Sequence, residues 1–397
     1  MKQFILLIAI SFLSLGAWAQ DEQSKSSGGF QFTTIKENPV TSIKNQASSG
    51  TCWCFSGLAF IESELLRMGK STYDFSEMYI VHKNYQDKAK KYVRMHGKTN
   101  FAGGGSFADV IDGIRDYGLV PELEMQGLNY GETSHRHGEM DVLLESYVTT
   151  VIKNKNGKLS PAWFNGYRGI LDSYLGKCPE KFTYDGKEYT PQSFAQSLGI
   201  DADNYVSLTS FTHHPFYMAF PIEVPDNWRW ALSYNLPLDE IMAVMHYAVD
   251  KGYCVAWASD VSEKGFSRNG IAVVPDLEVP EGPGSDQAHW LGLTPTEREK
   301  VISESGKPVK ELNITQEMKQ IAFDNYQTTD DHGMLIYGTA KDQNGTVYFL
   351  VKNSWGEKNK YKGTWYASEA FVKYKTLNIV VHKDVLSKEL KKKLNIE

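Results

Sequence analysis

The chain has 397 residues, of which 41% are hydrophobic and 13% aromatic, so it is long enough to bury a large core as a globular protein. A formal net charge of −6 at pH 7, without a stripe of Lys and Arg alternating with aromatic residues, argues against nucleic acid as a partner. Only four cysteines occur, which excludes a fold held together mainly by disulfides.

The first residues, MKQFILLIAISFLSLGAWA, have the pattern of an export signal. Lys2 precedes an apolar run, and Ala17 and Ala19 flank Trp18 in the small-x-small arrangement that a signal peptidase accepts. The run is too short to span a bilayer, and no later segment is apolar for long enough to do so. We therefore expect a signal peptide at 1–19, no membrane span, and a soluble protein that is exported to the periplasm or secreted.

The remaining chain reads as one folded domain behind a flexible N-terminus. Residues 20–29 are polar and rich in Gly and Ser, which predicts a flexible segment, and the domain would cover 30–397. From about 128 to 221 the periodicity weakens, and Gly, Tyr and Pro are frequent. We interpret this segment as an insertion.

Apolar spacing predicts a series of helices in the first third of the domain. One helix covers 52–68 and stops at Gly69, and a second covers 75–95. The glycine turn at 103–105 precedes a third helix that ends at Gly118.

The last third mixes one strong helix with strands. Residues 235–252 form an amphipathic helix with Pro237 in its first turn, followed by a buried strand in YCVAWAS. The segment 303–327 is expected to be partly helical. Two β-rich runs flank Asn344 and Gly345, which is a hairpin signal.

The pair in SSGTCWCFSG raises a chemical question, because Cys52 and Cys54 are separated by one residue. A disulfide between them would misfit normal bridge geometry, and a metal site would need further ligands that the HRH and HH histidines do not supply at matching spacing. A helix N-terminus, in contrast, stabilises a thiolate. At ~100° per residue the two side chains point ~200° apart, so a reactive Cys52 implies that Cys54 faces the core. We expect no metal or cofactor.

A thiol nucleophile needs a base, a group that orients the base, and donors for the oxyanion that forms. Gln46 lies six residues before Cys52 and could donate its side-chain amide. His332 heads the first β-rich run, and Asn353 lies at the end of the second.

The segments NQASSGTCWCFSG, GGG, DDHGMLIYG and VKNSWG, in this order, resemble the papain-like cysteine peptidases. The resemblance implies an α+β, papain-like two-lobe fold, with a helical lobe, a β-rich lobe and a large insertion. It assigns Cys52 as nucleophile, His332 as general base and then acid, Asn353 as the residue that orients the imidazole, and Gln46 as an oxyanion donor.

The resemblance also gives roles to residues around this group. Trp355 would shield the hydrogen bond between His332 and Asn353, and Trp53 would pack between the lobes. Gly104 and Gly105 match a wall that pairs with the substrate backbone, although an ordinary turn into a helix explains them equally well. A thiolate–imidazolium pair is the resting state expected at neutral pH.

Ser49 indicates which branch of the family the chain resembles. Typical relatives carry a disulfide-bonded cysteine there, whereas Ser49, the long separation of Cys52 from His332, and the segment YNLPLDEIMAVMHYAVDKGYCVAWASDV look more like the bleomycin hydrolase or aminopeptidase C branch. That branch forms hexamers that enclose the active sites, and its C-terminus lies in the cleft, so that peptides are trimmed from the amino end.

The implied function is thiol-dependent hydrolysis of peptides through an acyl-enzyme on Cys52, as an aminopeptidase. The alternatives are an exported endopeptidase with an unblocked cleft and a non-catalytic descendant that binds peptides.

The hairpin provides an internal test of the proposed site. A two-residue turn at Asn344 and Gly345 would place Asn353 opposite Ile336, ~13 Å along the strand from His332. The mechanism therefore requires a longer loop near 341–344, or a bulge. Asp330 and Asp331, at the entrance of the strand, could tune the imidazolium or line the substrate pocket, but acidic residues at such a position are more often only solvated, and this is what we expect.

Overall fold

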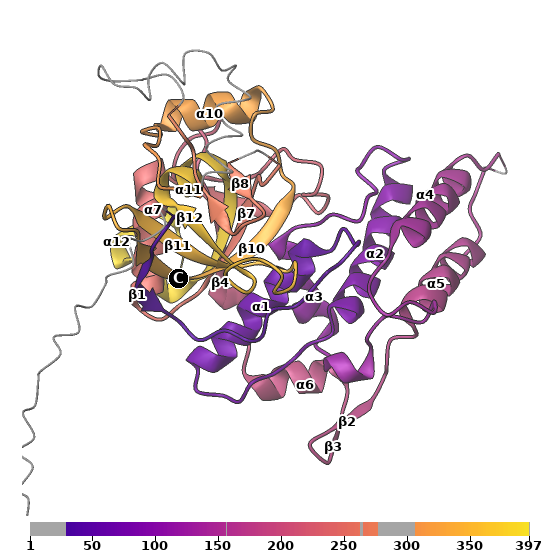
Figure 1. The fold of residues 1–397 in the computed structure, drawn as a ribbon. Helices are drawn as coiled ribbons and strands as arrows, with labels where there is room; N and C mark the ends of the chain where they lie inside the picture. The colour runs from indigo at the N-terminus through magenta and orange to yellow at the C-terminus, as the bar shows by residue number, and fades with distance from the viewer. Residues whose placement is uncertain (1–28, 156, 263–264, 277–305, 397) are drawn as a thin grey trace, which may run out of the picture.

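The computed structural model describes residues 29–155, 157–262, 265–276 and 306–396, which fold into two lobes (Figure 1). The expected signal peptide at 1–19 and the N-terminal segment up to 28 lie outside the described residues. In the part of the chain that is described, no helix is long and apolar enough to cross a membrane.

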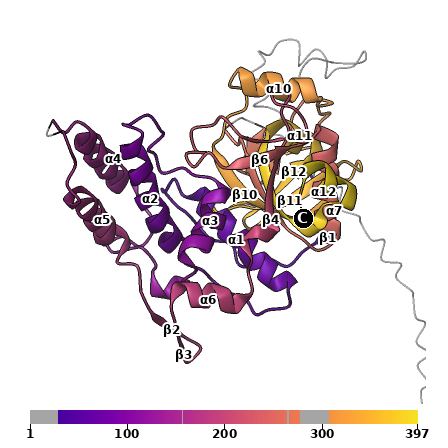
Figure 2. The same ribbon diagram turned by 180° about the vertical axis from the view of Figure 1, so that it is seen from behind.

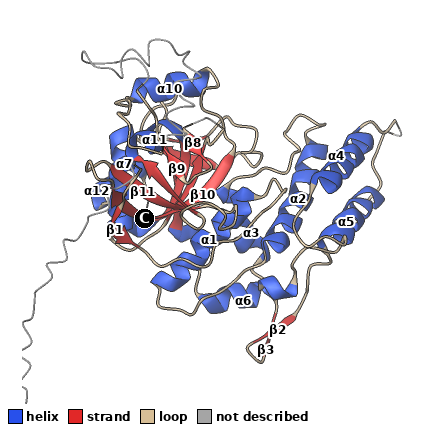
Figure 3. Ribbon diagram, viewed as in Figure 1, coloured by secondary structure: helices blue, strands red, loops and turns tan. Residues whose placement is uncertain are grey.

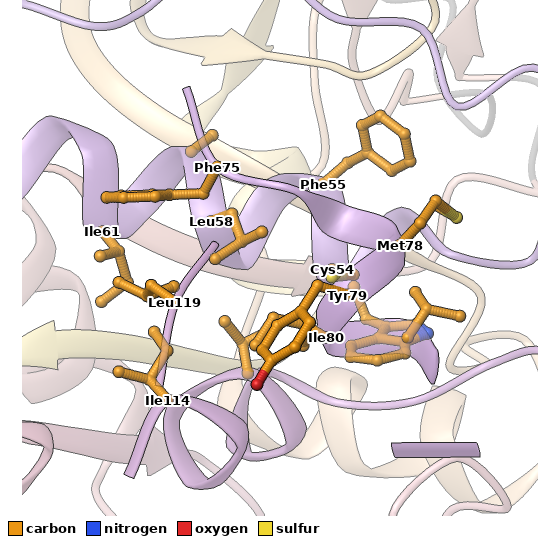
Figure 4. Packing of buried hydrophobic residues seen from close by; sticks show 14 of the residues in the cluster. Cys54, Phe55, Leu58, Ile61, Phe75, Met78, Tyr79, Ile80, Ile114 and Leu119 are labelled. Carbon is orange, nitrogen blue, oxygen red and sulfur yellow. The ribbon is translucent and has the colours of Figure 1, made fainter. Parts of the chain in front are cut away.

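The helical lobe is built on α1 (Cys52–Arg67), α2 (Glu77–Arg94) and α3 (Phe107–Tyr117), which confirm the helices predicted in this region. The Ser76 side chain caps α2 by accepting the N–H of Tyr79, and α3 ends at Gly118, whose φ is 79°. Apolar side chains of these helices interlock in one cluster, with α1 buried along most of its length (Figure 4).

The segment predicted as an irregular insertion contains two further helices. They are α4 (Gly138–Ile152) and α5 (Ala162–Leu175), and they extend the helical lobe beyond α2 in both views (Figures 1 and 2). The periodicity was weak because each helix buries one narrow stripe, which in α4 consists of Met140, Leu144 and Val148.

The rest of this segment contributes to both lobes. A small hairpin, β2 (Phe182–Tyr184) and β3 (Lys187–Tyr189), and helix α6 (Pro191–Leu198) belong to the helical side. Strands β4 (Tyr205–Thr209) and β5 (Ala219–Pro221) join the main sheet instead.

The second lobe is an 11-stranded sheet in the order β5-β6-β4-β13-β7-β10-β11-β12-β9-β8, with β1 also paired to β10 (Figure 3). Its other strands are β1 (Thr33–Glu37), β6 (Leu232–Asn235), β7 (Val255–Ser259), β8 (Phe266–Ser267), β9 (Ile271–Ala272), β10 (His332–Lys341), β11 (Val347–Lys352), β12 (Thr364–Ser368) and β13 (Thr376–His382). Its helices are α7 (Leu238–Asp250), α10 (Gln316–Asp324), α11 (Glu369–Lys375) and α12 (Lys388–Leu394). The predicted amphipathic helix, buried strand and partial helix are confirmed as α7, β7 and α10, except that Pro237 precedes α7 rather than lying in its first turn.

The β10–β11 hairpin combines a loop longer than two residues with a bulge, although the loop does not lie at 341–344 as expected. Lys341 pairs with Val347, so the turn spans 342–346, and the register then shifts between Ile336 and Gly338. After this bulge Leu335 pairs with Lys352, which places Asn353 two residues closer to His332 than a tight turn would.

The two lobes meet where α1 packs on β10. A Cβ atom at Gly333 would lie 2.8 Å from the Ser56 hydroxyl of α1 and 3.3 Å from the ring of Phe107. This contact holds the N-terminus of α1, and with it Cys52, against the start of β10 at His332.

We expect Gly118→Ala to destabilise the protein strongly. Besides the positive φ, the new methyl group would lie 2.3 Å from the backbone of Pro191. Strain and overpacking together predict a loss of about 2–5 kcal/mol in the free energy of unfolding, measured by urea denaturation.

Gly186→Ala is the matched control, because Gly186 has φ 74° but nothing within 4 Å of its Cβ position. Equal losses for the two variants would contradict the close α3–α6 packing.

Candidate active site

Cys52 and Cys54 point to different surroundings, as the helix geometry predicts. Cys52 is the first residue of α1 and is partly exposed, whereas Cys54 is fully buried in the cluster of Figure 4. The Cys54 sulfur lies 3.3 Å from the carbonyl oxygen of Glu77. All four cysteines are free thiols, so Cys178 and Cys254 do not pair.

His332 and Asn353 come together at the ends of adjacent strands. Nε2 of His332 lies 2.8 Å from Oδ1 of Asn353, and both side chains are buried. The amide oxygen can only accept, so Nε2 carries the proton and Nδ1 is left as the basic nitrogen. The Trp355 ring lies 4.8 Å from the imidazole, centroid to centroid, and covers this hydrogen bond.

Burial dominates the electrostatics of the Cys52–His332 pair. It raises the pKa of Cys52 to about 12, against the opposing effect of the backbone N–H groups of Gly333 and Trp53. It also lowers the pKa of His332 to about 4, which the hydrogen bond to Asn353 only partly offsets. Burial thus favours a neutral thiol beside a neutral imidazole, in contrast to the thiolate–imidazolium pair expected from the sequence.

Gln46 is held rigidly in the loop before α1. Its Nε2 donates to the carbonyl oxygen of Ser49 at 2.9 Å, and its Oε1 accepts from the Ser354 hydroxyl at 2.6 Å. Ser49 donates back to the carbonyl oxygen of Gln46 at 2.8 Å, so hydrogen bonds fix this loop at the position where typical relatives carry a disulfide. The second N–H of the Gln46 amide is the one that could serve an oxyanion.

The predicted glycine wall is close-packed. A Cβ at Gly105 would lie 2.9 Å from the Trp53 ring, and one at Gly104 would lie 2.0 Å from a carboxylate oxygen of Asp226. Trp53 also donates its indole N–H to the carbonyl oxygen of Gly103 at 3.1 Å. Gly105 lines the pocket, whereas Gly104 does not, and Asp226 lies over the Cβ position of Gly104.

One pocket between the lobes brings the reactive groups together. Cys52 and His332 both line it, with further walls from the start of α3, from β13 and from the residues before β6. Three carboxyl groups share this pocket: Asp226, Asp330 and Asp331.

The sequence-based expectation for these carboxyl groups was wrong for Asp330, which is half-buried in the pocket. Asp331 is exposed and accepts the N–H of Val261 at 2.9 Å. Sequence reasoning missed Asp226 altogether, and the only signal was its place in the aromatic segment PDNWRW.

Among the described residues, the group with metal-ligand character is His213, His214 and Glu223, whose ligand atoms all lie within 4.8 Å of one another. The two Nε2 atoms lie 3.0 and 2.7 Å from the Glu223 carboxylate. Neither histidine lines the Cys52 pocket.

Comparison with known proteins finds papain-like relatives. The model of the papain family cysteine proteases matches residues 30–106, and that of the Peptidase C1-like family matches 309–397. Aminopeptidase C of Listeria monocytogenes is 23% identical over 99% of this chain and 91% of its own length. Aminopeptidase G of Lactobacillus delbrueckii subsp. lactis is 21% identical over 89% of this chain and 83% of its own length.

A solved structure with a similar fold is that of PepW from Lactobacillus rhamnosis. It has a TM-score of 0.67 and 21% identity, and the match covers 91% of this chain and 84% of PepW.

The pKa of His332 sets the acid limit of any activity that uses it as a base. Above a pKa of about 4 the imidazole is neutral and can accept the Cys52 proton, and below it the imidazolium cannot. We expect kcat, measured at saturating peptide substrate, to be maintained at pH 5–6 and to fall by half near pH ~4. Circular dichroism at each pH controls for unfolding. A half-loss near pH ~6.5, the ordinary value for histidine, would contradict the buried environment of His332.

Proposed function

The chain belongs to the papain-like cysteine peptidases, and we propose that it is a thiol-dependent aminopeptidase. The observation that carries the proposal is the pocket that Cys52 and His332 both line, where the imidazole is hydrogen-bonded to Asn353.

The groups around Cys52 support hydrolysis through an acyl-enzyme. Sγ of Cys52 attacks the carbonyl carbon of the first peptide bond, and its proton passes to Nδ1 of His332. The oxyanion accepts from the backbone N–H of Cys52 and the amide of Gln46. His332 then protonates the leaving amine, and water, deprotonated by His332, hydrolyses the thioester.

Restriction to amino ends is supported by the names of the relatives, which are aminopeptidases. The described C-terminal residues do not provide this restriction, because α12 packs on the β lobe and no residue after Asn378 lines the pocket. Leu390 and Leu394 of α12 are buried in the same cluster as α7. If the enzyme is an aminopeptidase, a group other than these C-terminal residues must therefore block the cleft.

Two further proposals rest on the sequence alone. The hexameric assembly of the aminopeptidase C branch remains a proposal for this chain. Export is also a proposal. If the leader is cleaved after Ala19, N-terminal sequencing of the mature protein should begin at Gln20. An N-terminus at Met1 in the mature protein would contradict export by this signal.

The activity is tested with fluorogenic aminoacyl amides, either with a free α-amino group or N-acetylated. We expect the parent protein to cleave the free-amino substrates, and Cys52→Ala to lose at least about 10³-fold in kcat/KM, because the nucleophile is absent. Cys54→Ala is the matched control. It should keep its activity within about threefold and lose about 1 kcal/mol of stability, because Cys54 only packs in the core.

Efficient cleavage of N-acetylated peptides would favour the endopeptidase alternative. Peptide binding without turnover by the folded parent protein would favour a binding protein. Full activity of Cys52→Ala would exclude the proposed mechanism.

A further inference from the structure

A segment between β5 and β6, residues 222–231, crosses from the β lobe to the helical lobe, and we call it the strap. Arg229 of the strap donates to one carboxylate oxygen of Asp109 at 2.7 Å, and Trp228 donates to the other at 3.1 Å. Asp109 is fully buried and also accepts the backbone N–H of Ser106 at the start of α3. Because a buried, hydrogen-bonded ion pair anchors it, the strap is fixed across one end of the pocket.

Asp226 of the strap lies directly on the glycine wall. Oδ1 accepts the side-chain N–H of Asn100 at 3.0 Å, while Oδ2 lies where a Cβ of Gly104 would be. A substrate strand that continued upstream of the cleaved bond would need the backbone of this wall for pairing. Asp226 covers the wall at Gly104, so the pocket favours peptides whose amino end lies at this wall.

Asp330 enters the same pocket from the start of β10. No described residue donates a hydrogen bond to its carboxyl group, and burial together with the charges of Asp226 and Asp331 raises its pKa to about 8. Among the described residues that line the pocket, none is a Lys or an Arg. Lys88 is the near cation, but its ammonium lies behind the wall, on the carbonyl oxygens of Ala102 and Gly104.

We propose that Asp226 and Asp330 together bind the α-ammonium group of the substrate's first residue. This proposal rests on the aminopeptidase function and names the part of the chain that restricts it to amino ends. In a peptide the α-nitrogen lies only ~2.5 Å from the carbonyl carbon that the nucleophile attacks. Its anchor must therefore line the same pocket as Cys52, and both carboxyl groups do. The ammonium would supply the positive charge that this acidic pocket lacks.

A basic side chain is the competing ligand for two carboxyl groups. A Lys or Arg side chain upstream of the cleaved bond would need its own backbone to continue past Gly104, where Asp226 lies. The covered wall therefore favours the terminal ammonium.

The test compares Asp226→Asn, Asp330→Asn and the double variant with the parent protein, using aminoacyl amides with a free or an N-acetylated α-amino group. Asn keeps the shape of Asp but removes the charge. A charge-assisted contact predicts that kcat/KM for free-amino substrates falls by about 10–100-fold, while that for N-acetylated substrates is unchanged or rises. The ratio of kcat/KM for free-amino substrates to kcat/KM for N-acetylated substrates should decrease most in the double variant.

Asp185→Asn is the matched control, because Asp185 is exposed on the β2–β3 turn and has the positive φ of 49° that Asn tolerates. The melting temperature and the circular dichroism spectrum verify that each variant is folded.

The outcomes separate this proposal from the proposed function. A parent protein that cleaves neither substrate class would refute the aminopeptidase itself. A parent protein that prefers free-amino substrates, with variants that keep this preference, would refute only the ammonium anchor. The parent protein could instead strongly prefer N-acetylated dipeptides with Lys before the cleaved residue, and the variants could lose this preference. That result would also refute the ammonium anchor, and it would indicate that the two carboxyl groups bind a basic side chain.

Discussion

The close contact of α1 with β10 at Gly333 is the constraint on which the site depends. The two elements come from opposite lobes and are far apart in sequence, and each supplies one half of the reactive pair at its own end. Because Gly333 has no side chain, the helix approaches until the Ser56 hydroxyl would touch a Cβ atom. The backbone N–H of Gly333 also lowers the pKa of the Cys52 thiol, against the larger effect of burial, so the residue next to the base acts on the nucleophile.

The second requirement is the register of the hairpin that carries His332 and Asn353. A regular two-residue turn would separate these side chains along the strands, whereas the loop at 342–346 and the bulge near Tyr337 move Asn353 back toward the base. The 2.8 Å hydrogen bond and the cover provided by Trp355 then leave a single nitrogen of the imidazole available to the thiol. A local irregularity in a strand thus sets the geometry of the whole site.

Much of this could be predicted from the sequence, because it depends on local signals. Periodicity and turn residues predict the helix from Cys52, the opposite directions of the Cys52 and Cys54 side chains, the strand that begins at His332 and the strand that ends next to Asn353. The helices α4 and α5 were missed because their buried stripes are narrow. The role of Asp226 could not be predicted, because its position over Gly104 is set by the distant ion pair of Arg229 and Asp109. The same holds for Asp330, which lines one pocket together with residues of the strap.

Cys52 attacks substrates whose free amino end lies in the pocket if the proposed function is correct. Treating the protein with an aminoacyl fluoromethyl ketone that has a free α-amino group, and mapping the adduct with tandem mass spectrometry, checks this attack. We expect a thioether on Cys52, none on Cys54, Cys178 or Cys254, and little reaction with the N-acetylated reagent. Labelling of another cysteine, or equal labelling of Cys52 by the N-acetylated reagent, would contradict the proposed function.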